Sequence, residues 1–483
     1  MTREPAKTLA HDERGTILVL WAIVLGVVLG FVALSFDLGR ASITRSELQS
    51  FADSVALASA GELDGTPDSI TRARTAAALI LDQQSFGNTD RSLQGAVDYT
   101  LTFFRSLPAS DASAMTDVTT DPARAAFVRV SVTPTVVEST FGAAFASLTN
   151  LTNRDYTLGA TAVAGLSILA CDVQPMMFCL PNANYTAEGN IGDMIRLRAG
   201  GSGAAWAPGD FGFLDPRGIE VDPSGPCAGE NGAGLLRCLI GAVDNITQCF
   251  DQRGVDIEPG QKNGLENSIF NVRFDIYNQA MGNARYQNSP NYAPAPNVIK
   301  GLVPPGRSTC VANNPAVSPN TVALPKDTCF LNGTCATASG TGNARFGDGV
   351  WSRSSYFTPN YGVPNRFPSD TTRYQVYLRE LATAGTGNIL TGRAETGRPT
   401  CSGAAPAGPD RRIITVAGID CAANNIRGAA NNVPVKEFFK IFLTEPVDSG
   451  NNIWGEVVGS ASEEGTGAIG TGGIVRDVVQ LYR

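Results

Sequence analysis

The chain has 483 residues, 43% of them hydrophobic and 17% charged, so it is long enough for about two to four domains with well-filled cores. Its 52 Gly and 28 Pro indicate a globular protein rich in loops. The net charge of −8 and the lack of a Lys/Arg cluster argue against a nucleic-acid partner, because binding to phosphates requires clustered positive charge.

The first long pattern is an apolar run from Thr16 to Phe36 (TILVLWAIVLGVVLGFVALSF), which carries no charge. A bilayer core of about 30 Å requires about 20 apolar residues of helix, and this run provides them. It therefore predicts one membrane-spanning helix, with the lipid bilayer as a partner. The alternative is a cleaved signal peptide with Ala33-Leu34-Ser35 at the cleavage site, but signal cores usually have about 7–15 residues and this run is longer.

All ten cysteines follow the apolar run, and none forms a Cys-x-x-Cys motif. The single histidine, His11, precedes the run, so mixed Cys/His zinc sites, His-assisted hydrolysis and a His-activated cysteine nucleophile are not expected beyond it. An even number of scattered cysteines favours disulfides in an oxidising compartment. We therefore expect residues 1–15 in the cytoplasm and the chain after Asp37 in the periplasm of a bacterium, a topology that the small excess of basic residues before the run supports only weakly. The disulfide candidates are Cys171, Cys179, Cys227, Cys238, Cys249, Cys310, Cys329, Cys335, Cys401 and Cys421.

The sequence does not determine how ten cysteines pair. Cys227, Cys238 and Cys249 are spaced at equal intervals around a predicted helix that would place them on one face, so at least one of them must pair elsewhere. Proximity in the sequence suggests three further pairs: Cys171 with Cys179, Cys329 with Cys335, and Cys401 with Cys421.

The helical pattern continues beyond the apolar run, because Leu48, Ala52, Val55 and Ala56 recur at helical spacing and the first breakers lie at Gly61 to Pro67. One helix is therefore expected from about Gly15 to Ala60. The small residues on its second half would let a sheet or another helix approach closely.

This part of the chain resembles the Flp pilus-assembly TadE/TadG-like proteins of the tight-adherence (Tad) system. The matching residues are Arg14-Gly15, Asp37-Leu38-Gly39-Arg40, Leu48-Gln49, Ala52-Asp53 and Ala56-Leu57-Ala58, all within about the first 60 residues. The resemblance implies a pseudopilin-like component of Tad pilus assembly or adhesion, with Tad platform proteins or TadE-like pseudopilins as partners. Position 20 is Leu, where TadE-like pseudopilins have Glu, so the resemblance favours the TadG-like branch, which keeps its anchor.

The helix supplies the candidate partner contacts. The charges of Asp37 and Arg40 either set the register of the helix against a partner subunit or form an i,i+3 pair at the lipid headgroups. Asp53 either caps a neighbouring element or faces water. The full set of candidates is Asp37, Arg40, Leu48, Gln49, Ala52, Asp53, Val55 and Ala56.

Residues 63–166 predict a small pilin-like α/β module in which the long helix lies over an antiparallel sheet. Thr66-Pro67-Asp68 is a helix-start signal for a helix to about Gln84. Alternation and β-forming residues predict strands at 95–105, 126–137 and 156–166, with Pro134 at an edge or bulge. A helix is expected from Ser139 to Leu148.

Residues 167–483 form the predicted cysteine-containing periplasmic domain, with strands expected at 412–419, 438–443 and 453–458. Two loops are rich in acids: one holds Asp210, Asp215, Glu220 and Asp222, and the other holds Asp251, Asp256 and Glu258. Acids in such loops commonly make local turn hydrogen bonds, and the alternatives are a calcium site or a glycosidase pair.

Together these patterns predict an α+β protein: a transmembrane helix at 16–36, its continuation at 37–62, the module at 63–166 and the large mixed domain. We expect no catalytic residues, no cofactor and no metal, apart from the calcium alternative. The leading hypothesis is a non-enzymatic, inner-membrane-anchored component of Tad pilus assembly or adhesion that forms homo- or hetero-oligomers. The alternative is a periplasmic protein that binds or cleaves carbohydrate with its carboxylates.

Overall fold

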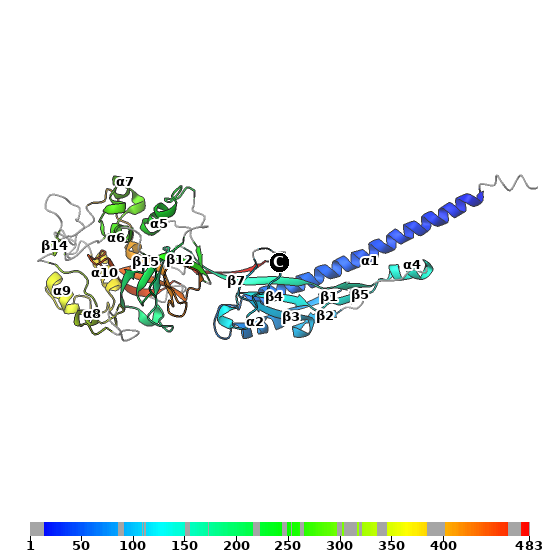
Figure 1. Ribbon diagram of the computed structural model, residues 1–483, viewed down its shortest axis with the longest axis horizontal. Helices are drawn as coiled ribbons and strands as arrows, with labels where there is room; N and C mark the ends of the chain where they lie inside the picture. Colours follow the sequence, from blue (N-terminus) through cyan, green and yellow to red (C-terminus); the bar gives the residue numbers. More distant parts are fainter. Residues whose placement is uncertain are drawn as a thin grey trace, which may run out of the picture. The chain divides into compact units, whose positions relative to one another are not determined.

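The computed structural model (Figure 1) describes residues 14–85, 91–108, 110, 113–149, 155–171, 173–215, 223–243, 249–252, 254–260, 265–296, 302–303, 316–317, 321–335, 345–383, 401–461 and 475–482. The chain divides into two compact units, one of Met1–Ser167 with Val478–Arg483 and the other of Ile168–Asp477. The predicted domain boundary lies one residue from this division, but the last residues return to the first unit. The mixture of helices and sheets makes the protein α+β, as predicted.

The first unit is built on one long helix, α1 (Arg14–Ala60). It ends at Ala60, directly before Gly61, as expected from a sequence whose first helix breakers begin at Gly61. From Ala33 onward one stripe of α1 is buried, and in the second half of the helix this stripe includes Leu48, Phe51 and Val55. The predicted continuation of the helix beyond the apolar run is therefore correct.

The buried stripe of α1 packs against the antiparallel sheet of the first unit (Figure 1). Its strands β3 (Tyr99–Phe104), β4 (Phe127–Val132) and β7 (Thr161–Cys171) lie in that order, and β19 (Val475–Leu481) also pairs with β7. β4 contacts α1 directly and carries alternating buried residues, Val128, Val130 and Val132. The expected arrangement of helix over sheet is present.

Several predicted boundaries differ from the structure. The predicted helix to Gln84 ends earlier, as α2 (Ser69–Ala78), and β1 (Leu81–Gln84) follows it and pairs with β2 (Arg91–Gln94). Thr66 is not the cap, because Asp68 holds that position and makes no side-chain cap bond. The strand predicted from Gly95 begins only after a short helix, α3 (Gly95–Asp98).

The strand predicted at 126–137 is interrupted at Thr133–Pro134. Proline has no N–H for the ladder, so β4 stops there and β5 (Thr135–Val137) pairs instead with β6 (Tyr156–Leu158). The hairpin of β5 and β6 carries α4 (Phe141–Thr149) between its strands. In Figure 1, α4 extends from β5 along the N-terminal half of α1, and the two helices are in contact.

The second unit is organised around an eight-stranded sheet in the order β16-β12-β10-β8-β15-β17-β18-β9. An additional parallel pairing of β9 with β10 closes six of these strands, from β10 to β9, into a ring. Alternate strand residues such as Phe211, Phe439 and Ile441 belong to one apolar core cluster. The strand bounds are β8 (Met176–Cys179), β9 (Met194–Ala199), β10 (Asp210–Leu214), β12 (Val255–Pro259), β15 (Ile413–Ile419), β16 (Ala430–Val433), β17 (Glu437–Leu443) and β18 (Asn452–Ser460).

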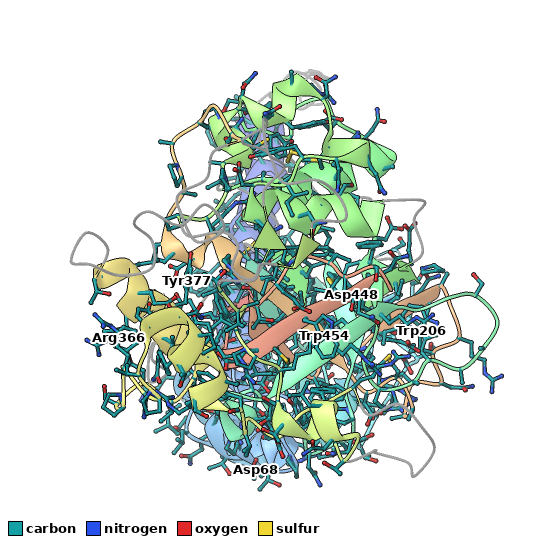
Figure 2. All side chains as sticks on the ribbon, turned by 90° about the vertical axis from the view of Figure 1, so that its left-hand side faces the viewer. Asp68, Trp206, Arg366, Tyr377, Asp448 and Trp454 are labelled. Atoms are coloured by element: carbon teal, nitrogen blue, oxygen red, sulfur yellow. A yellow bond between two sulfur atoms is a disulfide. The ribbon has the colours of Figure 1, made fainter. Side chains whose placement is uncertain are left out.

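The strands predicted near the C-terminus are all present, as β15, β17 and β18. Short helices surround the sheet to which they belong. Trp454 of β18 is buried, and its indole N–H donates to Asp448 at 2.9 Å (Figure 2). The helices are α5 (Gly232–Gly241), α6 (Leu265–Asn271), α7 (Ala284–Gln287), α8 (Thr328–Asn332), α9 (Arg353–Tyr361) and α10 (Arg373–Ala382), and the short strands are β11 (Cys249–Asp251), β13 (Leu302–Val303) and β14 (Ala316–Val317).

Candidate functional site

The N-terminal half of α1 is apolar and exposed on nearly all sides. Among its large residues, Phe31 is 66% exposed and Leu34 and Phe36 are each 51% exposed. Such a surface is unfavourable in water but suited to lipid, and α1 is long and apolar enough to cross a membrane. The burial begins at Ala33 and Asp37, which mark the change between the two halves of the helix.

Asp37 holds the beginning of α4. Its carboxylate accepts hydrogen bonds from the Ser139 hydroxyl at 2.7 Å and from the backbone N–H groups of Gly142 at 2.6 Å, Thr140 at 3.2 Å and Phe141 at 3.3 Å. The N–H groups in the first turn of a helix lack partners within the helix, and a carboxylate is a strong acceptor for them. Asp37 is only 3% exposed and therefore acts as a cap supplied by a distant part of the same chain.

Arg40 is directed to the same place, because its guanidinium donates to the Thr140 hydroxyl. Two roles were predicted for Asp37 and Arg40: to set the register of the helix against a partner subunit, or to pair with each other at the lipid headgroups. Neither hypothesis anticipated that the two residues would join α1 to α4. Ser139 and Thr140 were missed as site residues. Hydroxyl residues directly before an apolar helix are an N-terminal signal, but that signal does not identify the acceptor.

The other candidate partner contacts are explained mainly by contacts within the unit. Leu48, Ala52, Val55 and Ala56 are all 0% exposed in the first unit, so that face cannot contact a partner in this structure. The spacing correctly predicted an interior face, but the protein's own sheet covers it.

Gln49 and Asp53 form a local pair. The Gln49 amide donates to Asp53 at 2.8 Å and to the backbone carbonyl of Thr161 at 3.1 Å. Asp53 is partly exposed and accepts this bond from its own helix, so it does not cap a neighbouring element. The pair ties α1 to β7 within the first unit.

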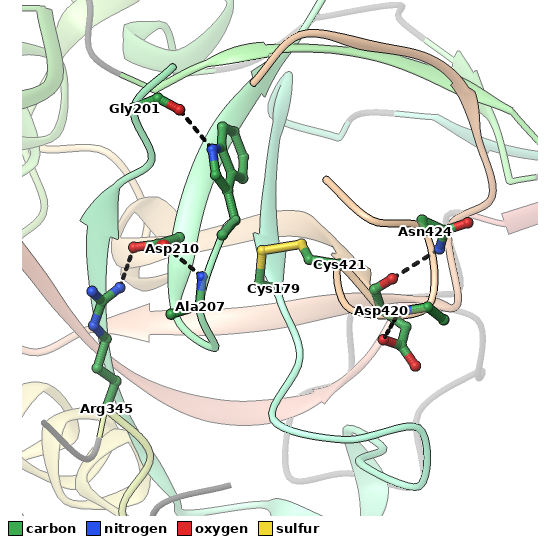
Figure 3. The surroundings of a disulfide bond; sticks show 10 residues. Cys179, Gly201, Ala207, Asp210, Arg345, Asp420, Cys421 and Asn424 are labelled. Carbon is green, nitrogen blue, oxygen red and sulfur yellow. Dashed lines mark hydrogen bonds and ion pairs between the residues drawn. A yellow bond between two sulfur atoms is a disulfide. The ribbon is translucent and has the colours of Figure 1, made fainter. Parts of the chain in front are cut away.

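The disulfides in the described part of the chain lie in the second unit. Cys179 of β8 pairs with Cys421 just after β15, across 242 residues of sequence (Figure 3). Next to it, Asp210 pairs with Arg345 and also accepts a hydrogen bond from the Ala207 N–H at 2.7 Å. These cross-links join segments that are distant in the sequence at the closed sheet.

The disulfide predictions were correct in one case and wrong in two. Cys329 pairs with Cys335, as predicted. The suggested pair of Cys171 with Cys179 is wrong, because β11 pairs with β7 and brings Cys249 opposite Cys171. Cys401 is disulfide-bonded but not to Cys421, and Cys310 lies outside the described residues.

The helix predicted to carry three cysteines is shorter than expected. It ends at Gly241, so it holds Cys238, which pairs with Cys227, whereas Cys249 is on β11 and bridges outward to Cys171. The inference that one of the three must pair elsewhere is correct.

The two acid-rich loops are brought together at one point. Asp215 and Asp256 lie on neighbouring segments, and the N–H of Asp215 donates to the carbonyl of Asp256 at 2.8 Å. Asp256 also accepts from the N–H of Asn432 at 2.9 Å, a bond between segments 176 residues apart and not the local turn hydrogen bond expected of such acids. Glu220 and Asp222 lie outside the described residues, and among the residues that are described no group of three or more His, Cys, Asp or Glu side chains could hold a metal ion. Asp251 and Glu258 are on β11 and β12.

A buried charge network in the second unit was not predicted. Arg373 at the start of α10 pairs with Asp327 and with Glu456, and all three side chains are fully buried. Asp327 also accepts from the N–H groups of Asp348 at 3.0 Å and Gly349 at 2.9 Å. These residues have no sequence motif in common, so their charge pairing depends on the folded structure.

Asp193 lies beside this network and has an altered acidity. Burial, together with the negative charges of Asp327 and Asp348, raises the pKa of Asp193 to about 7. Asp193 therefore changes its charge near neutral pH, within a loop that packs against β18.

Comparison with known proteins gives one result. A search of curated proteins and a search of solved structures found no match to the chain. The family model described as putative Flp pilus-assembly TadE/G-like matches residues 15–62. The matched segment contains the whole apolar half of α1, Asp37 and the buried face that packs on the sheet. Over residues 15–62 the chain is therefore similar to the Tad domain of the putative Flp pilus-assembly TadE/G-like family.

Proposed function

We propose that the protein is a non-enzymatic component of Tad (Flp) pilus assembly or adhesion, anchored in the bacterial inner membrane by a single helix. The observation that carries the proposal is that the Tad domain coincides with α1, a helix with one exposed apolar half and one half packed on a sheet. The first half has the length and composition of a membrane anchor, and the second half connects that anchor rigidly to a folded module.

In this proposal the N-terminus is cytoplasmic and both folded units are periplasmic. The disulfides of the second unit support an oxidising compartment. The pilus platform or TadE-like pseudopilins would contact the exposed half of α1. The face of the second half that carries Leu48 and Val55 is already covered within the first unit. The role is mechanical: the anchor holds the periplasmic units where pilus subunits emerge.

A complementation experiment tests this function. Deletion of the gene should abolish surface pili, and the full chain should restore them. A version in which residues 1–36 are replaced by a cleavable signal peptide should reach the periplasm but should not restore pili. Full restoration by this released form, or normal pili in the deletion strain, would contradict the proposal.

The second candidate is a periplasmic protein that binds or cleaves carbohydrate. The observation in its favour is that two acid-bearing segments meet where the Asp215 N–H donates to the Asp256 carbonyl. Replacement of both residues by Asn separates the candidates. Loss of glycan binding or turnover with intact pili would favour the carbohydrate function, whereas normal glycan behaviour would leave the assembly function as the better explanation.

A further inference from the structure

The helix α4 has an unusual composition for an element on the surface of a periplasmic module. Its sequence, FGAAFASLT, contains no charged residue. Phe141 at its start is 45% exposed, and Ala144 and Ser147 are exposed further along. A hydrophobic helix of this kind is expected to be covered by something other than water.

The position of α4 indicates what covers it. The ring of Phe141 packs edge-on against Phe36, the last residue of the apolar run, with 4.7 Å between the ring centroids. Phe36 and Phe141 are both about half exposed, so the exposed apolar surface of α1 continues onto the start of α4.

A groove between α1 and the start of α4 shows how deep this surface extends. It is lined on one side by α1 residues that include Gly26, Gly30 and Asp37, and on the other by Ser139, Gly142 and Tyr156. Gly26 and Asp37 are about 16 Å apart along the helix axis, which is about half of a 30 Å hydrocarbon core. If Asp37 lies at the membrane surface, the groove reaches about the middle of the bilayer.

The polar groups at the start of α4 are satisfied in the way that such a position requires. Lipid cannot hydrogen-bond to the free N–H groups of a helix, so a helix that begins at the hydrocarbon boundary needs protein acceptors. Asp37 accepts from the N–H groups of Thr140, Phe141 and Gly142, and Arg40 binds the Thr140 hydroxyl. This cap belongs to the anchor itself and fixes α4 at the depth where the apolar run ends.

We propose that α4 is a second membrane contact, inserted among the phospholipid chains of the periplasmic leaflet beside α1 and held there by Asp37. The inference rests on the proposed anchoring of α1. Two attachments to the bilayer restrict rotation of the first unit about the axis of α1, which a single helix cannot do. The ligand is the acyl-chain region of phospholipid, and a second copy of the chain or another membrane protein is an alternative outcome of the test.

The test uses the full chain in vesicles of phosphatidylethanolamine and phosphatidylglycerol, without reductant. The described cysteines are disulfide-bonded, so one introduced cysteine can carry an environment-sensitive NBD label. The test position is Ala144→Cys, with Leu34→Cys as the position in the anchor and Ser54→Cys as an exposed position on the second half of α1. Quenching is measured with doxyl-labelled phospholipid and with aqueous iodide.

We expect doxyl lipid to quench the label at position 144 within about twofold of the label at position 34, and iodide to quench only the label at position 54. Adding Asp37→Asn should reduce the lipid quenching at position 144 and leave that at position 34 unchanged. Iodide quenching at position 144 with lipid quenching at position 34 would overturn the inference and leave the anchor intact. Protection of position 144 from both quenchers would also overturn it, because protein would then cover α4. Loss of lipid quenching at position 34 as well would show that the anchoring itself is wrong.

Discussion

Replacement of Asp37 by Ala should release α4 from α1 without unfolding the rest of the first unit. The two shortest hydrogen bonds, from Gly142 at 2.6 Å and Ser139 at 2.7 Å, are charge-assisted; the first is partly buried and the second is buried. At about 1.5 kcal/mol each they would contribute about 3 kcal/mol, and the two longer bonds contribute little. Water that hydrates the freed N–H groups recovers part of this, so a loss of about 2 kcal/mol is expected, at the upper end of measured N-cap substitutions.

Hydrogen exchange followed by mass spectrometry on the full chain in nanodiscs measures this loss. A change of 2 kcal/mol corresponds to an increase of about 30-fold in the exchange rate of α4 amides, with the amides of β4 unchanged. Asp53→Ala is the matched control, because Asp53 is also a carboxylate of α1 but accepts its hydrogen bond from Gln49 of the same helix. Its effect should remain below about 0.5 kcal/mol. Equal exchange of α4 in the Asp37 variant and the natural chain would refute the reasoning, as would an equal effect of the control.

A change on the α4 side of the cap provides an independent perturbation. A Cβ at residue 142 would collide with the Ser139 hydroxyl and lie 3.1 Å from the Asp37 carboxylate. Gly142→Ala should therefore destabilise the α4 attachment by about 1–3 kcal/mol in the same exchange experiment. Gly159→Ala is the control, because its Cβ would meet only ordinary contacts, such as Pro134 at 3.7 Å. If the two variants behaved alike, the proposed geometry of the cap would be wrong.

Two further predictions concern the second unit. Loss of the disulfide between Cys179 and Cys421, by double replacement with Ala, should destabilise the unit by about 5 kcal/mol, and loss of that between Cys329 and Cys335 by about 2 kcal/mol. The difference is expected because the first disulfide closes a loop of 242 residues and the second a loop of 6. Denaturant unfolding of the two variants measures the losses, and a larger loss for the short loop would contradict the prediction. Burial raises the folded pKa of Asp193 to about 7 from 3.8, so the folded chain retains a proton that the unfolded chain releases, and stability falls as the pH rises from about 4 to about 7. Asp193→Asn should therefore reduce the difference in unfolding free energy between pH 5 and pH 8 by about 1–2 kcal/mol, a value discounted for the partial exposure of Asp193. If this difference were the same in the variant and the natural chain, another group would cause the pH dependence.

Local patterns in the sequence predicted the elements that depend on neighbouring residues. The extent of α1 follows from the absence of a breaker before Gly61, and the strands β15, β17 and β18 follow from their β-branched and aromatic residues. The face of Leu48 and Val55 was correctly recognised as an interior face. The sequence did not show what covers it, because periodicity describes one element and not its neighbour.

Features that depend on long-range pairing were not predictable in this way. Asp37 meets Ser139 across about a hundred residues, and only the N-cap pattern before α4 indicated that an acceptor was needed. Cys249 reaches Cys171 only because β11 pairs with β7, and the ring of strands closes only through the parallel pairing of β9 with β10. Each of these contacts depends on the register between distant segments, which composition and spacing do not determine.

The central claim is that the protein takes part in pilus assembly through the exposed half of α1 in the membrane. The most direct measurement is photo-crosslinking in cells from Leu29, which is 55% exposed in the apolar half, compared with Ala52, which is fully buried in the second half. Identification of the captured proteins by mass spectrometry should show a Tad pilus-assembly membrane protein from position 29 and only crosslinks within the chain from position 52. Capture of the assembly partner from position 52, with none from position 29, would contradict the account.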